Sequence, residues 1–356
     1  MTLLDRYITR QANASILAVL ASLLGLITLF ALFEELDEAE VVYGFAEALN
    51  YIIKTTPRRL DEILVYALFI GYLVTLGRLA ETNELTILRV SGMSVRRICL
   101  ALAPSMVLWL GISISTSELL APKMERQAET EKMAILYGEE ALDSRGGLWL
   151  RASGLYMHVQ AIDTEDRIRG ITQYWVDDQQ NLTETVRADL GTYHADMGYW
   201  IFEQGHRTRL IDGLAQQETF AHWTWENTIT PDVVASQALL EPNKMSMLAL
   251  YQQIQFARSQ SLGVSEYELA FWSRVLKPLS FLGMMLLALG VVMGPLRQVG
   301  MGLRLTFGIF AGLGFKYLQD LFAPAAIVFD IPALIAILIP IAGYWLFALW
   351  LIRRNA

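Results

Sequence analysis

The 356-residue chain has a single cysteine, Cys99, so no disulfide can form within it. It also lacks the G-x-x-x-x-G-K-[ST] loop that binds ATP phosphates and the G-x-S-x-G motif of serine hydrolases. Histidine is scarce, and the spacing of the few present is not that of metal ligands; they are His158, His194, His206 and His222. We therefore expect no catalytic residue, no metal and no bound cofactor in this chain.

Charge is missing from several long segments. The apolar core of a bilayer is crossed by about 20 apolar residues in a helix. Six segments are predicted to cross: Gln11–Phe33, Ile63–Gly77, Ile98–Ser117, Pro278–Leu296, about Leu305–Phe322, and Ile331–Ile352. A mean hydropathy of +0.37 agrees with a membrane protein. The first segment is longer than the apolar part of a cleaved signal peptide, and acidic residues rather than a small-residue cleavage site follow it.

These segments fall into two groups of three, separated by a long polar insert. We expect residues 1–121 to hold the first three helices and residues 265–356 the last three. Residues 122–264 are then a separate domain that ends in a linker helix. The fold class is an α+β membrane protein.

Basic residues near the segment ends predict the orientation, because such residues are retained on the cytoplasmic side. With a cytoplasmic N-terminus, that side receives Arg6, Arg10, Arg78, Arg89, Arg96, Arg97, Arg297, Arg304, Arg353 and Arg354. Only Asp5, Glu81 and Glu84 oppose them there. The net charge of −8 therefore conceals an asymmetry, and both termini are predicted to be cytoplasmic and the insert external.

The insert has the pattern of β structure from about residue 122 to 242. Short runs rich in aromatic and β-branched residues alternate with turn signals. The runs are Leu148–Leu150, Leu155–Val159, Ile171–Val176, Tyr199–Phe202 and Phe220–Trp225. This spacing predicts a sandwich, a jelly roll or an open barrel. From Met245 to about Phe256 the pattern becomes helical, and a second helix from about Ser265 is expected to lead directly into the fourth span.

The loop between the second and third spans predicts a short helix over about residues 83–92. Asn83 can cap its start, Glu84 suits its first turn, and Gly92 can end it. Leu85 and Leu88, with Ile87 or Val90, give it an apolar side. Such a helix can lie on the membrane surface or insert into a groove of a cytoplasmic partner, and physical reasoning favours neither.

Several motifs, in order along the chain, carry a family resemblance. They are Leu4–Ile8, Asn83–Leu85 with Ser91–Gly92, Pro122, Trp272–Arg274, Lys277–Ser280 and Gly294–Arg297. Together they resemble the LptF/LptG permease family over the whole length, and the first and last are closer to the LptG branch. The resemblance implies six helices with a periplasmic β-jellyroll between the third and fourth. It also implies location in the inner membrane of a Gram-negative bacterium.

The resemblance further implies partners and an activity in outer-membrane biogenesis. Such permeases form an LptF–LptG heterodimer on an LptB ATPase dimer, which binds the ATP and magnesium, with LptC alongside. They extract lipopolysaccharide from the inner membrane and pass it to the periplasmic bridge protein LptA. In that setting the short helix is the coupling helix, comprising Asn83, Glu84, Leu85, Leu88, Arg89, Ser91 and Gly92. Glu84 would be its polar contact with the ATPase, and Leu85 and Leu88 its apolar anchors.

A cavity for a phosphorylated lipid needs basic residues at its rim. The candidates are Arg58, Arg59, Lys123, Arg126, Lys132 and Lys316. Lys316 lies within a span, where it can face the cavity, extend to the interface or pair with Asp320.

The first span departs from the family at its outer end. Many relatives have a lysine there, but this chain has Glu34, Glu35, Asp37, Glu38 and Glu40. Either the phosphate contacts have moved to Arg58, Arg59 and Lys316, or divalent cations bridge acids to phosphates.

Two other functions compete with this interpretation. An ion-gradient transporter would have discontinuous spans with buried acids and an internal repeat, and no sequence repeat relates the two halves. A membrane-tethered periplasmic scaffold would need only one or two spans.

Overall fold

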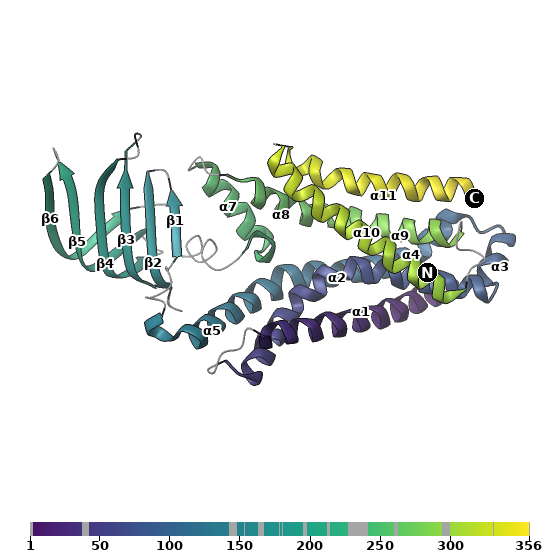
Figure 1. Ribbon diagram of the computed structural model, residues 1–356. Helices are drawn as coiled ribbons and strands as arrows, with labels where there is room; N and C mark the ends of the chain where they lie inside the picture. Colours follow the sequence, from purple (N-terminus) through teal and green to yellow (C-terminus); the bar gives the residue numbers. More distant parts are fainter. Residues whose placement is uncertain are drawn as a thin grey trace. The chain divides into compact units, whose positions relative to one another are not determined.

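The computed structural model of the chain divides into two compact units (Figure 1). A helical unit contains Met1–Ala39, Gly44–Glu125 and Glu268–Ala356, and a sheet unit contains Glu40–Tyr43 and Arg126–Tyr267. The structure describes residues 3–37, 43–141, 148–152, 154–162, 167–177, 179, 181–194, 198–211, 214–226, 241–259, 263–293, 300–329 and 331–355.

Long helices build the helical unit. They are α1 (Leu3–Asp37), α2 (Phe45–Glu81), α4 (Val95–Ser115), α9 (Lys277–Met293), α10 (Met301–Val328) and α11 (Ala333–Asn355), and the short α3 (Glu84–Val90) joins α2 to α4. Figure 1 places α3 near the N-terminus of α1.

Four helices in the described residues are long and apolar enough to cross a membrane: Leu3–Asp37, Phe45–Glu81, Val95–Glu129 and Ala333–Arg354. The bent pair Ser265–Val275 and Lys277–Met293 makes a fifth if it is counted as one span. The predicted fifth segment lies in α10, whose part Tyr317–Val328 is apolar but shorter than a membrane span. The membrane-protein class is supported, whereas the count of six is not confirmed.

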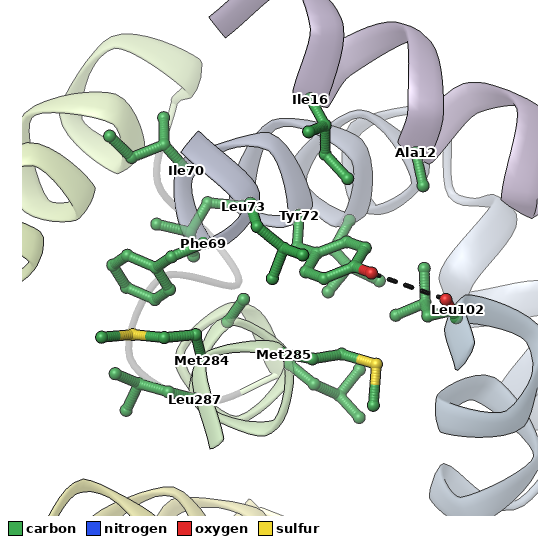
Figure 2. Packing of buried hydrophobic residues seen from close by; sticks show 14 of the residues in the cluster. Ala12, Ile16, Phe69, Ile70, Tyr72, Leu73, Leu102, Met284, Met285 and Leu287 are labelled. Carbon is green, nitrogen blue, oxygen red and sulfur yellow. Dashed lines mark hydrogen bonds between the residues drawn. The ribbon is translucent and has the colours of Figure 1, made fainter. Parts of the chain in front are cut away.

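Helix α2 is the centre of this unit. In the most apolar 18-residue stretch of α2, 67% of the residues are buried, whereas in the most apolar 18-residue stretch of α1 only 17% are buried. Figure 2 shows Phe69, Tyr72 and Leu73 of α2 among Met284 and Met285 of α9. The Tyr72 hydroxyl lies 2.9 Å from Ser105 Oγ of α4, which satisfies a polar group in this apolar core.

Gly71 sets the distance between α1 and α2. A Cβ at this position would lie 2.6 Å from Ile16 Cγ1 and 2.7 Å from its Cα. Because the second of these atoms belongs to the backbone, a side chain could not be accommodated by a change of rotamer alone. The absence of a side chain therefore allows close helix packing at this crossing.

The third span continues well beyond the predicted end at Ser117. A π-helix, η1 (Thr116–Leu120), joins α4 to α5 (Ala121–Ala141). The prediction of β structure from residue 122 was therefore wrong at its start. Ala, Glu, Lys, Met and Gln dominate α5, and these residues favour helix over strand.

The helix before the fourth span does not lead directly into it. Helix α8 (Ser265–Val275) and α9 meet at an angle of 54°. Pro278 lies one residue into α9; it has no N–H for the carbonyl four residues earlier, and its ring clashes with that carbonyl. The predicted continuous helix is corrected to a bend at Leu276.

The sheet unit contains one antiparallel sheet whose strands pair in sequence order. The strands are β1 (Leu148–Ala152), β2 (Leu155–Ile162), β3 (Arg167–Val176), β4 (Leu182–His194), β5 (Tyr199–Ile211) and β6 (Leu214–Glu226). All five predicted runs lie inside strands. Strand β4 was missed because its sequence, LTETVRADLGTYH, is rich in charge and contains a glycine.

An apolar face of this sheet forms a second core. Met157, Val186, Trp200 and Phe202 are fully buried there, and Phe256 of α7 (Met247–Ser259) packs with them. The predicted helix at Met245–Phe256 corresponds to α7. The described strands form a meander, in which each strand pairs with the next. Because a jellyroll has two sheets with Greek-key connections, this single sheet does not confirm the predicted jellyroll.

Candidate functional site

Helix α3 begins differently from the sequence prediction. Asn83 has φ 58°, the left-handed region that asparagine tolerates, and its side chain makes no capping hydrogen bond. The prediction of a side-chain cap at Asn83 was therefore wrong. The carboxylate of Glu84 instead accepts hydrogen bonds from the Tyr7 hydroxyl and from Thr82 Oγ1, each at 3.0 Å. The start of α3 is thereby joined to α1.

The end of α3 follows the prediction. The Met93 N–H donates to the Leu88 carbonyl, and the Gly92 N–H donates to the Arg89 carbonyl. Gly92 has φ +85°, a conformation that glycine adopts without steric cost. These two bonds form a Schellman motif, which ends the helix after two turns.

The apolar residues of α3 point in two directions. Leu85 is 6% exposed and belongs to the core of the helical unit, with Leu88 packed against that core. Ile87 and Val90 are 62% and 84% exposed. In this structure Leu85 anchors α3 to its own helical unit, so its predicted role as an anchor for a partner is corrected. Ile87 and Val90 form the exposed apolar surface.

A second cluster of charged residues joins α2 to η1, α5, α8 and α9. Arg58 Nε donates to Glu125 Oε1 at 3.0 Å, and Arg58 Nη1 donates to Glu62 Oε1 at 2.5 Å. Lys277 Nζ lies 2.7 Å from Asp61 Oδ2, and Arg274 Nη1 lies 3.1 Å from Glu118 Oε1. Each of these basic groups is therefore neutralised by a carboxylate within the chain.

Arg59 differs from its neighbour Arg58. Its Nε is buried and has no hydrogen-bond acceptor among the described residues. A buried guanidinium N–H without an acceptor is costly, and an anion would satisfy it. Of the predicted phosphate contacts on α2, Arg59 is therefore the better suited to bind an external anion.

The other predicted phosphate contacts are not brought together by anything that the structure describes. Lys123 is exposed in the helical unit, whereas Arg126 and Lys132 belong to the sheet unit. Lys132 Nζ lies 5.8 Å from the ring centroid of Tyr43. The Lys316 side chain, Glu38, Glu40 and the Gly294–Arg297 motif lie outside the described residues.

Comparison with known proteins identifies the family. Residues 6–354 match the family described as "Lipopolysaccharide export system permease LptF/LptG". The chain belongs to the LptF/LptG permease family. It is similar to the lipopolysaccharide export system permease protein LptG of Escherichia coli K12, with 27% identity over 99% of this chain and 98% of that protein. The corresponding protein of Haemophilus influenzae is 29% identical over the same shares.

Two features of this LptF/LptG family member were not predicted from its sequence. The first is the pair formed by Asp61 and Lys277, to which the Ser113 hydroxyl also donates. Lys277 was noted only as part of a motif, and nothing local to Asp61 indicates a partner so distant in sequence. The second is the hydrogen bond from Tyr7 to Glu84, which links two motifs of the resemblance, Leu4–Ile8 and Asn83–Leu85.

Proposed function

We propose that this chain is a non-catalytic membrane subunit of an ATP-driven exporter of lipopolysaccharide. Family membership supports the permease role, and its relatives are named for lipopolysaccharide export. The absence of the phosphate-binding loop from the sequence supports hydrolysis of ATP by a partner. In the proposed assembly the partners are a second permease of the LptF type, an LptB ATPase dimer, LptC and the bridge protein LptA.

The observation that carries the proposal is the exposed side of α3. A helix of two turns, fixed at both ends, presents Ile87 and Val90 outward while Leu85 holds it to the helical unit. A rigid projection of this kind suits a groove on an ATPase, because little conformational freedom is lost on docking. Movement of the ATPase would then be transmitted through α3 to α2, which is the centre of the unit.

The proposed orientation places α3 and both termini in the cytoplasm and the sheet unit in the periplasm. The distribution of arginine near the ends of the helices supports this orientation. We propose that the sheet unit, in a jellyroll-like form, receives the lipid on its way to the outer membrane. Arg59 is the proposed phosphate contact that the geometry favours, and the remaining basic candidates stay proposals.

The decisive experiment tests whether α3 binds an ATPase. The full chain is co-expressed with its permease and ATPase partners, and the amount of co-purified ATPase is measured. We expect Val90→Asp to reduce recovery of the ATPase at least tenfold, because a carboxylate would be desolvated in the groove. Leu214→Asp is the matched control, since Leu214 is 71% exposed in the sheet unit. Normal recovery with Val90→Asp would contradict the proposal.

Glu84 requires a separate control because it has an internal partner. If Glu84 contacts the ATPase directly, Glu84→Gln should reduce export and ATPase recovery while Tyr7→Phe leaves both nearly unchanged. If its role is only to accept the hydrogen bond from Tyr7, Glu84→Gln, which keeps an acceptor oxygen, should have no larger effect than Tyr7→Phe. An effect of Glu84→Gln no larger than that of Tyr7→Phe would therefore remove Glu84 from the docking surface.

An ion-gradient transporter is the second candidate, and the pair of Asp61 with Lys277 favours it. Both side chains lie in the helical unit, at 16% and 14% exposure. Proton transport would require Asp61 to release Lys277 during the cycle. Export that continues without ATP but collapses when the proton gradient is removed would support this alternative.

A further inference from the structure

One face of the sheet combines aromatic rings with hydroxyl, imidazole and guanidinium groups. The register places Trp149, His158, Thr172, Arg187, His206 and Thr219 side by side across β1 to β6. This row lies on the face opposite the apolar core, because its members alternate along each strand with buried residues such as Met157 and Val186.

The neighbouring row on the same face has a similar character. It runs from Tyr156 through Tyr174, Thr185 and Thr208 to Gln217. These two rows contain no carboxylate and no lysine. The nearest acid along β4 on this face is Asp189, two residues beyond Arg187. In a chain with 36 acidic and 28 basic residues, the rows form a surface of aromatic, hydroxyl, imidazole and guanidinium groups.

The aromatic residues gather at the β1 side of this face. The ring of Trp149 is stacked on that of Tyr174, with centroids 6.0 Å apart and planes inclined by 22°. The ring centroid of His158, on the paired strand β2, lies 4.9 Å from that of Trp149. Trp149 nevertheless remains 59% exposed. A large exposed ring that is held in place by two others is a rigid apolar platform with polar groups around it.

We propose that this face binds an anionic saccharide, and that in the exporter proposed above it contacts the sugar portion of the cargo. The apolar face of a pyranose ring stacks on Trp149, while threonine and tyrosine hydroxyls exchange hydrogen bonds with the sugar hydroxyls. Arg187 is exposed and can bind a phosphate or carboxylate group on the sugar with two parallel hydrogen bonds. The shortage of carboxylates in the two rows supplies the charge complementarity for such a ligand.

The saccharide interpretation is favoured over a protein partner by the composition of the two rows. A protein interface would be expected to have an apolar centre. Here Trp149 and Tyr174 are followed by threonine, histidine, arginine and glutamine across the remaining strands. Polar side chains with both donor and acceptor capacity match the dense hydroxyl groups of a sugar.

The test uses the full chain in detergent and a phosphorylated core oligosaccharide released from lipopolysaccharide and free of lipid. Saturation-transfer NMR and titration calorimetry measure its binding. We expect Trp149→Ala and Arg187→Gln each to weaken the affinity at least fivefold. Arg209→Gln is the control for lost charge, since Arg209 is 49% exposed and pairs with Glu184 on the same sheet. Leu214→Ala is the control for lost exposed apolar surface.

Further arms separate the alternatives. Removal of the phosphate groups should weaken binding to the wild type and abolish the effect of Arg187→Gln, while Trp149→Phe should retain most of the affinity. No binding of the oligosaccharide to the wild type, or equal binding by Trp149→Ala, overturns the proposal. Release of a protein partner by Trp149→Ala, with oligosaccharide affinity unchanged, also overturns it and assigns the face to that partner.

The failure of this proposal and that of the exporter proposal are distinguishable. ATP hydrolysis by the complete assembly is measured with and without lipopolysaccharide. Hydrolysis that responds to lipopolysaccharide, combined with no oligosaccharide binding by the chain, rejects the saccharide face and leaves the exporter intact. If ATP hydrolysis does not respond to lipopolysaccharide although the chain binds the oligosaccharide, the exporter proposal is rejected and the saccharide face is kept.

Discussion

The two ends of the helical unit are held together by different interactions. Near α3, three polar contacts join helix α1 to its neighbours. Tyr7 donates a hydrogen bond to Glu84 of α3. In α4, the Ala101 carbonyl accepts from Thr9, and Arg97 forms an ion pair with Asp5. At the other end, α2, α4, η1, α5, α8 and α9 are joined by the cluster of ion pairs that includes Asp61 with Lys277.

Helix α1 changes character between these two ends. Its buried residues lie almost entirely between Asp5 and Leu20, and beyond Leu20 only Glu35 is buried. Leu26, Phe30 and Phe33 are about half or more exposed. A helix packed on one half of its length can change its contacts on the other half without loss of the core. In the assembly proposed above, the exposed half of α1 is therefore the part available to lipid or to the second permease.

The largest expected effect comes from the charged end. Lys277→Met would leave the Asp61 carboxylate poorly compensated, and we expect it to reduce the free energy of unfolding by about 3 kcal/mol. Thermal unfolding of the full chain in detergent measures this effect. The double variant Asp61→Asn with Lys277→Met should recover much of the loss, because no uncompensated charge remains. Additive losses would show that the two residues do not form a coupled pair.

The packed half of α1 should be the next most sensitive region. We expect Gly71→Ala to reduce the free energy of unfolding by about 1–3 kcal/mol, because the new methyl group meets the backbone of Ile16. The matched control is Gly25→Ala in the exposed half, where a Cβ has no atom within 4 Å. The same thermal unfolding assay compares the two. Equal effects would contradict the division of α1 into a packed and an exposed half.

The same comparison shows what the sequence could and could not predict. Long charge-free runs predicted the apolar helices, because hydrophobicity is a local property of the segment. The pair of Asp61 with Lys277 escaped prediction because 216 residues separate its members and neither has a local signal. In α3, seven residues are too few for the helical period to separate Leu85, which is buried, from Ile87, which is exposed. Strand β4 was hidden because Glu184, Arg187 and Asp189 interrupt the aromatic and β-branched pattern by which the other strands were predicted.

The smallest expected effect concerns an exposed carboxylate, Asp177, in the turn between β3 and β4. The backbone N–H of Asn181, then its side-chain amide and the N–H of Gln179, lower the pKa of Asp177 below its usual value. A lowered pKa in the folded state means that the ionised form stabilises the turn above the pKa of the unfolded chain, about 4. This contribution is lost as the pH falls through the lower pKa of the folded state.

We therefore expect the difference in apparent Tm between wild type and Asp177→Ala to be small above about pH 5 and to shrink toward zero below the folded-state pKa. Thr183→Ala removes a hydrogen bond to the Trp175 carbonyl in the same hairpin, and no ionisable group takes part in it. Its difference from wild type should stay constant over the same pH range. If both differences shrink together, the pH dependence belongs to the whole sheet rather than to Asp177. A constant difference for Asp177→Ala would mean that its carboxylate does not stabilise the turn through its charge, in contrast to the role expected of Asp61 at the charged end of the helical unit.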